Sequence, residues 1–167
     1  MINIDIQSTY CVISDENNRS ARKLEFKGSD QTGISKRRVS HKWFDDGKWR
    51  VDIFYNNDES INKVLLFLIS DKIHLKLKQE NLYKKNHLWK ITHYDPDGYD
   101  IYIFKNDLII EEWMVIYSEE IESNFKLLPD WIHTRKFYDY ENRLIKVYSY
   151  DQFNNRIYDY DRLEKML

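Results

Sequence analysis

Polar and apolar residues alternate along most of the chain. Residues 2–6 read I-N-I-D-I, residues 50–55 read R-V-D-I-F-Y and residues 73–78 read I-H-L-K-L-K. A period of two places the apolar side chains on one face of a strand, and these segments are rich in the β-branched and aromatic residues that favour strands. The pattern predicts a mainly β protein.

Turn residues separate these segments. Asp46-Gly47 and Asp97-Gly98 each lie between two strand-like stretches. Because Asp-Gly readily supplies positive φ angles to tight hairpin turns, we expect Gly47 and Gly98 to adopt them. Turns recur roughly every 10–14 residues, as in an antiparallel meander. We therefore predict about ten strands forming a curved sheet or partial barrel.

Two stretches depart from the strand pattern. One short helix is expected near 119–128, because Ser118 can cap it, two glutamates occupy its first turn and Pro129 ends it. Residues 58–72 fit either a helix or strands. The short apolar run Val64–Ile69 favours strands, with a helix as the alternative.

Short repeats recur along the chain. The stretches that begin at Gly47 and Gly98 are alike, and the strings Y-D-Y-E, Y-S-Y-D and Y-D-Y-D start ten residues apart from Tyr138 onward. The tyrosine strings predict a register in which Tyr148 lies opposite Tyr158 on one face. The length of 167 residues suits one domain, and we predict a single domain, 1–167, built from repeated β-hairpin units.

The repeats carry a family resemblance. The Y-D strings resemble the YD repeats of Rhs proteins, and the strand–turn–strand cadence over residues 41–161 is similar to the variant MORN repeats of bacterial YwqK-type antitoxins. The resemblance implies an immunity protein of a contact-dependent or Rhs-type polymorphic toxin system. The resemblance lies in the spacing of strands and turns and not in a residue motif, so it assigns no functional residue in this chain.

No catalytic or metal-binding motif stands out. The five histidines form no H-E-x-x-H pair, and a single cysteine, Cys11, excludes zinc-finger spacing and an internal disulfide. We expect Cys11 to be a small core residue, and we expect no cofactor, no metal and no enzymatic activity. The acidic N-terminus and the absence of a long apolar run predict a cytoplasmic protein without a membrane partner.

Charge is distributed unevenly. The chain has a net charge of −2, but residues 92–122 hold one lysine against nine acidic residues, while residues 19–50 carry +6. Acidic clusters steer basic partners, and Tyr and Trp anchor protein interfaces. A solvated hairpin face is the plainer interpretation of the acidic segment. The candidate partner-binding residues are Asp95, Asp97, Tyr99, Asp100, Asp107, Glu111, Glu112, Trp113, Glu119 and Glu120.

These features together favour one function. We expect an immunity protein that binds and neutralises a cognate secreted toxin domain, a basic protein and a nuclease among the candidates, by stoichiometric protein–protein binding. Nucleic acid is not expected as a partner. A β-sheet module for a small ligand or glycan is the first alternative, and it would show a Trp-lined or deep apolar pocket. An enzyme is the second, and it would bring two carboxylates and a histidine together.

Overall fold

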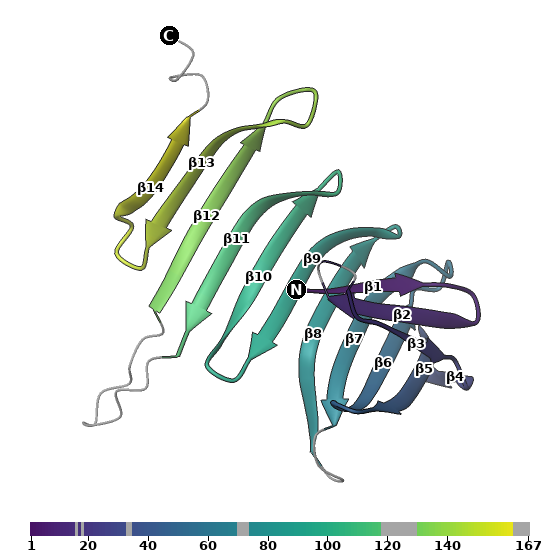
Figure 1. Ribbon diagram of the computed structural model, residues 1–167. Coiled ribbons are helices and arrows are strands. Elements are labelled where there is room, and N and C mark those ends of the chain that lie inside the picture. Colours follow the sequence, from purple (N-terminus) through teal and green to yellow (C-terminus); the bar gives the residue numbers. More distant parts are fainter. Residues whose placement is uncertain (16, 18, 33–34, 70–73, 118–129, 162–167) are drawn as a thin grey trace. The chain divides into compact units, whose positions relative to one another are not determined.

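The computed structural model describes residues 1–15, 17, 19–32, 35–69, 74–117 and 130–161. All regular structure in these residues is β-strand, and the strands form antiparallel meanders, which confirms the expected class (Figure 1). The described residues form fourteen strands, so the expected number of about ten is too low. The helix expected near 119–128 lies outside the described residues. The chain divides into two compact units, Met1–Leu88 and Trp89–Leu167, so the single domain stays a prediction.

Unit 1 contains two sheets. A three-stranded sheet is formed by consecutive hairpins, and the following strands pair in chain order as a second meander. The apolar run at Val64–Ile69 lies in a strand, as the favoured interpretation of residues 58–72 expected. The strands are β1 (Ile2–Ile6), β2 (Tyr10–Asp15), β3 (Ala21–Glu25), β4 (Gly28–Thr32), β5 (Ser35–Phe44), β6 (Gly47–Tyr55), β7 (Ile61–Ile69) and β8 (Leu75–Lys84).

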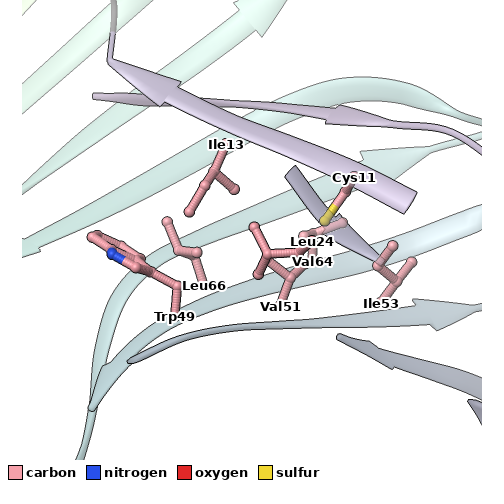
Figure 2. Packing of buried hydrophobic residues seen from close by; sticks show 8 residues of the cluster. All are labelled: Cys11, Ile13, Leu24, Trp49, Val51, Ile53, Val64 and Leu66. Atoms are coloured by element: carbon pink, nitrogen blue, oxygen red, sulfur yellow. The ribbon is translucent and has the colours of Figure 1, made fainter. Parts of the chain in front are cut away.

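The core of unit 1 lies between these two sheets (Figure 2). Ile13 from the small sheet packs in one cluster with Val51 and Leu66 from the large sheet. Each such side chain contributes roughly 1.5–3 kcal/mol on burial. Cys11 is fully buried in the same cluster, as expected. Burial, with a smaller effect from Asp5, raises the pKa of its thiol to about 12, so the thiol is neutral and unreactive near neutral pH.

A buried amide also joins the two sheets of unit 1. The Gln79 side chain on β8 is fully buried, and its Oε1 accepts a hydrogen bond from the Ile2 amide at 2.8 Å. Its Nε2 donates to the Ile2 carbonyl at 2.7 Å and to Asn81 Oδ1 at 2.9 Å. These hydrogen bonds hold the N-terminal strand against the large sheet, and they satisfy the polar atoms that are buried there.

Unit 2 is a six-stranded meander in which each strand pairs with the next in the chain. In neither unit do the described strands close into a barrel, because the strand order is linear. None of the described residues forms a helix with the length and apolar character needed to cross a membrane. The strands are β9 (His87–Asp95), β10 (Gly98–Lys105), β11 (Leu108–Ile116), β12 (Asp130–Tyr138), β13 (Leu144–Asp151) and β14 (Arg156–Asp161).

The two Asp-Gly turns differ from each other. Gly47 has the expected positive φ of 120°. Gly98 does not have a positive φ, so the expectation for it is wrong. Gly98 pairs with Asp95, which leaves Pro96 and Asp97 as the central turn residues. Glycine is required at position 98 for space, because an added Cβ would lie 2.0 Å from the carbonyl oxygen of Val115.

The expected tyrosine register is also wrong. Tyr148 pairs with Asp159, and Ser149 pairs with Tyr158, so Tyr148 and Tyr158 point to opposite faces. The register shifts between Ser149 and Tyr150. One extra residue in a strand moves every following side chain to the other face, and sequence spacing alone does not reveal it.

Candidate partner-binding site

The predicted site residues in strands β9 to β11 are divided between the two faces of the unit 2 sheet. Asp100 pairs with Met114, whereas the neighbouring Ile101 pairs with Trp113. Alternation therefore separates two surfaces. We call one the acidic face, formed by His93, Asp95, Asp100, Tyr102, Glu112, Met114, Ile116, Ile132, Thr134, Lys136 and Asp151. We call the other the aromatic face, formed by Tyr94, Tyr99, Glu111, Trp113, Trp131, His133 and Arg135.

The remaining predicted site residues lie elsewhere. Asp97 is in the turn that precedes β10, and Asp107 is in the turn that follows it, so the length of the strand separates them. Glu119 and Glu120 lie outside the described residues. The acidic segment of the sequence therefore does not form one continuous surface.

Two hollows lie on the acidic face among the described residues, and the larger of them is mainly apolar. Register places Asp100, Met114, Ile132 and Asp151 in one row across β10 to β13. Met114 is 48% exposed and Ile132 is 37% exposed, so apolar side chains in the middle of the row face solvent. They border a hollow of about 250 Å³. Its lining consists of Met114, Ile116, Ile132, Asp151, Gln152, Phe153 and Ile157, together with Trp131, which the strand register assigns to the aromatic face.

A smaller hollow adjoins the first and carries polar groups. It measures about 80 Å³, shares Met114 and Ile132 with the larger one, and is lined by the carboxylates of Asp100 and Glu112. The Tyr102 hydroxyl donates to Asp100 Oδ2 at 3.4 Å. Lys136 Nζ donates to Glu112 Oε1 at 2.6 Å, which fixes that carboxylate beside the apolar row.

The acidic face carries a negative charge overall. Asp95, Asp100, Glu112 and Asp151 lie on it, and Lys136 forms an ion pair with Glu112. The Asp95 carboxylate lies 3.5 Å from Nε2 of His93 on the same strand. Carboxylates at the edge of exposed apolar side chains form a surface that attracts basic groups and excludes water from its centre.

The aromatic face is held together by its own contacts. The Trp113 ring stacks on His133 at a centroid distance of 3.8 Å, and Trp131 lies 5.2 Å from Trp113. Glu111 approaches Nε2 of His133 at 3.4 Å. Burial lowers the pKa of His133, although Glu111 acts in the opposite direction. Tyr99 contacts two further tyrosines, so both predicted aromatic anchors are engaged in packing within the sheet.

The chemistry of the hollows is limited. Within the described part of the chain, no group of three or more His, Cys, Asp or Glu residues is arranged to hold a metal ion. The smaller hollow brings two carboxylates together, but no histidine lines it. The arrangement therefore offers recognition of apolar and cationic groups more readily than acid–base chemistry.

Sequence reasoning missed the apolar half of this site. Met114, Ile116 and Ile132 were not among the candidates, although they form the centre of the acidic face. A signal was present in β11, which reads L-I-I-E-E-W-M-V-I and is apolar on both faces near its end. A strand without polar alternation indicates contacts on both sides.

Comparison with known proteins identifies no relative of this chain. No family model matches the chain, and no curated protein and no solved structure gives a match. The resemblance to YwqK-type antitoxins and YD repeats therefore stays a prediction.

Proposed function

We propose that this protein is an immunity protein that binds a secreted toxin domain stoichiometrically through the acidic face of unit 2. One observation carries the proposal: exposed apolar side chains and carboxylates occupy the same face of β10 to β13. Contiguous exposed apolar residues with a polar rim are typical of protein interaction sites. The partner would place an apolar side chain in the larger hollow and a Lys or Arg against Asp100.

The size of the larger hollow favours a protein partner over a small molecule. Its volume of about 250 Å³ lies just under the lower end of the roughly 300–1,000 Å³ that is usual for small-ligand sites. Phe153 at its border is 74% exposed, so the hollow is open to a broad approaching surface. Such a surface suits an interface in which one anchor side chain is surrounded by flatter contacts.

Charge favours a basic partner. Residues 89–167 contain 10 Lys and Arg against 16 Asp and Glu, a net charge of −6. A field of this sign accelerates encounter with a positively charged protein, and salt screens it over about 8–10 Å. The choice of a toxin as the partner is supported by the hairpin cadence of residues 41–161.

Protection of a cell that expresses the toxin tests the proposal. The toxin domain encoded beside this gene is co-expressed with the wild-type protein, and growth together with a one-to-one complex is expected. Met114→Lys should abolish protection, because it places a cation in the centre of the acidic face. Phe137→Lys is the matched control, since Phe137 is 43% exposed and lies on the opposite face.

Two results would contradict the proposal. Full protection by Met114→Lys would remove the acidic face from the mechanism. A neighbouring gene product that is not toxic, or is toxic but not bound, would show that the immunity role is wrong.

A small-ligand module is the second candidate, and Trp131 in the lining of the larger hollow is the observation that favours it. Indole rings commonly form the stacking surface of ligand sites. Saturable quenching of tryptophan fluorescence by a mono- or oligosaccharide, lost in Trp131→Ala, would support this candidate. Tryptophan fluorescence that stays unchanged across a series of mono- and oligosaccharides would exclude the small-ligand module.

A further inference from the structure

The large sheet of unit 1 has a second face directed away from the core. Val51 and Ile53 point into the core, so alternation directs the side chain of Asp52 to the other side. Strand register fixes which side chains share that side. We call it the basic face, and it comprises Arg37, Val39, His41, Trp43, Lys48, Arg50, Asp52, Phe54, Lys63, Leu65, Phe67, Ile69, Leu75, Leu77, Glu80 and Leu82.

Two arginines on this face are held in place by one buried carboxylate. Asp52 is only 2% exposed. Arg50 binds it through two nitrogens, with Nε 2.6 Å from Oδ1 and Nη2 2.8 Å from Oδ2. Arg37 Nη2 also donates to Oδ2. A guanidinium fixed in this way loses little conformational freedom when it binds a further group.

Cations also lie over the aromatic rings of the basic face. Arg37 lies 5.4 Å from the centroid of the Phe54 ring, and Lys63 lies 5.0 Å from the same ring. Arg50 lies 5.9 Å from the Phe67 ring, and Lys48 lies 5.4 Å from the Trp43 ring. Each contact orients the positive group along the sheet surface.

The electrostatic balance of the basic face is positive. Its four Lys and Arg residues outnumber the two carboxylates of Asp52 and Glu80. The pKa of His41 is lowered, first by burial and then by Lys48, Lys27 and Arg50. Unit 1 as a whole has 16 Lys and Arg against 12 Asp and Glu, a net charge of +4.

We propose that the basic face binds an acidic segment of a partner protein. Arginine with aromatic residues is the composition of protein interface hot spots, and charge complementarity selects carboxylates. Single-stranded nucleic acid would need free ring faces on which bases can stack. Phe54, Phe67 and Trp43 each have a cation over the ring instead. The inference concerns unit 1 and is independent of the function proposed for unit 2.

A pair of matched probes tests this inference. The first is a labelled, C-terminally amidated peptide of alternating Glu and Thr with six of each. The second is a seven-nucleotide single-stranded oligothymidine, whose six phosphates match the six Glu charges. Binding to the full chain is followed by fluorescence anisotropy at low salt. The peptide is expected to bind more tightly, and to raise the pKa of His41 toward its ordinary value in an NMR titration.

Two double variants locate the bound peptide. Lys48→Gln with Lys63→Gln should weaken peptide binding roughly tenfold, from two lost charge contacts. Lys42→Gln with Lys76→Gln is the matched control, because these lysines are exposed on the other side of the same sheet. Arg37 and Arg50 are left intact, since their loss would leave the buried Asp52 unpaired.

Several outcomes would overturn the inference. Tighter binding of the oligothymidine would assign the face to nucleic acid. Equal weakening by both double variants would show non-specific attraction to the whole unit. Self-association of the protein that the Lys48 and Lys63 variants abolish would assign the face to a second copy of this chain.

Discussion

At the scale of single residues, Gly98 is the position in the unit 2 sheet where the lack of a side chain matters most. A Cβ at this position would meet the carbonyl carbon of Val115 at 3.1 Å and its oxygen at 2.0 Å. Both atoms belong to the backbone, so neither can rotate away. Gly98→Ala should therefore lower the free energy of unfolding by about 1–3 kcal/mol or more, measured by urea denaturation.

Asp97→Ala in the same turn is the control, because the Asp97 side chain is exposed and its replacement leaves the backbone of the turn unchanged. Its denaturation midpoint should remain close to that of the wild-type protein. If Gly98→Ala were as stable as Asp97→Ala, the close approach of β10 and β11 at this point would be wrong.

At the scale of elements, two hairpin loops of unit 2 share a five-residue design. Asp139 Oδ1 accepts hydrogen bonds from the amides of Glu141 and Arg143, both at 2.9 Å. Asp151 Oδ1 does the same for the amides of Phe153 and Asn155, at 2.9 and 2.8 Å. The fourth loop residue is asparagine in both, with φ of 62° and 61°. Asparagine tolerates this left-handed region better than most residues.

Replacing the first residue of such a loop should lower the stability of the protein by a measurable amount. Asp139→Ala should lower the melting temperature, whereas Asp139→Asn should lower it less, because the amide oxygen still accepts hydrogen bonds. The hydrogen bonds from Arg143, chiefly from its backbone, lower the pKa of Asp139 from 3.8. The stabilisation is therefore complete above about pH 4 and is lost as pH falls through the lowered pKa.

Thermal melts at pH 7 and below pH 3 test this expectation. The difference between wild-type protein and Asp139→Ala should shrink at the lower pH. A difference that is the same at both values would mean that the ionised carboxylate does not hold the loop.

Most elements could be predicted from sequence, but the site could not. Alternation identified strands such as β1 and β6, because a half-buried strand requires it. The same alternation places Glu111 and Glu112 on opposite faces of the sheet. A count of charges along the chain treats them as one cluster. The hollow beside Met114 also depends on Ile132, which the pairing register of the next strand, β12, places directly opposite it. Such a juxtaposition follows from pairing register, which bulges alter without a recognisable signal.

At the scale of the whole molecule, buried apolar residues are concentrated in unit 1. Val51, Ile53, Val64 and Leu66 are fully buried there, whereas Ile91, Val115 and Val147 in unit 2 keep 4–8% exposure. Amides of β6 and β7 should therefore exchange hydrogen most slowly, and those of β14 much faster. Leu66→Ala should destabilise the protein by about 2–5 kcal/mol. Equal protection of β6 and β14 in a hydrogen-exchange experiment would contradict this distribution.

The most direct test of the proposed function is the rate at which the protein associates with the toxin. A triple variant of the acidic face, Asp95→Asn with Asp100→Asn and Glu112→Gln, is compared with Asp107→Asn, Glu111→Gln and Asp159→Asn, which lie in a turn or on the opposite face. Both lose the same charge. At low salt the acidic-face variant should associate roughly tenfold more slowly with a weaker salt dependence, and the control should stay within about twofold of the wild-type rate. Equal association rates for the two triple variants would contradict a binding site on the acidic face.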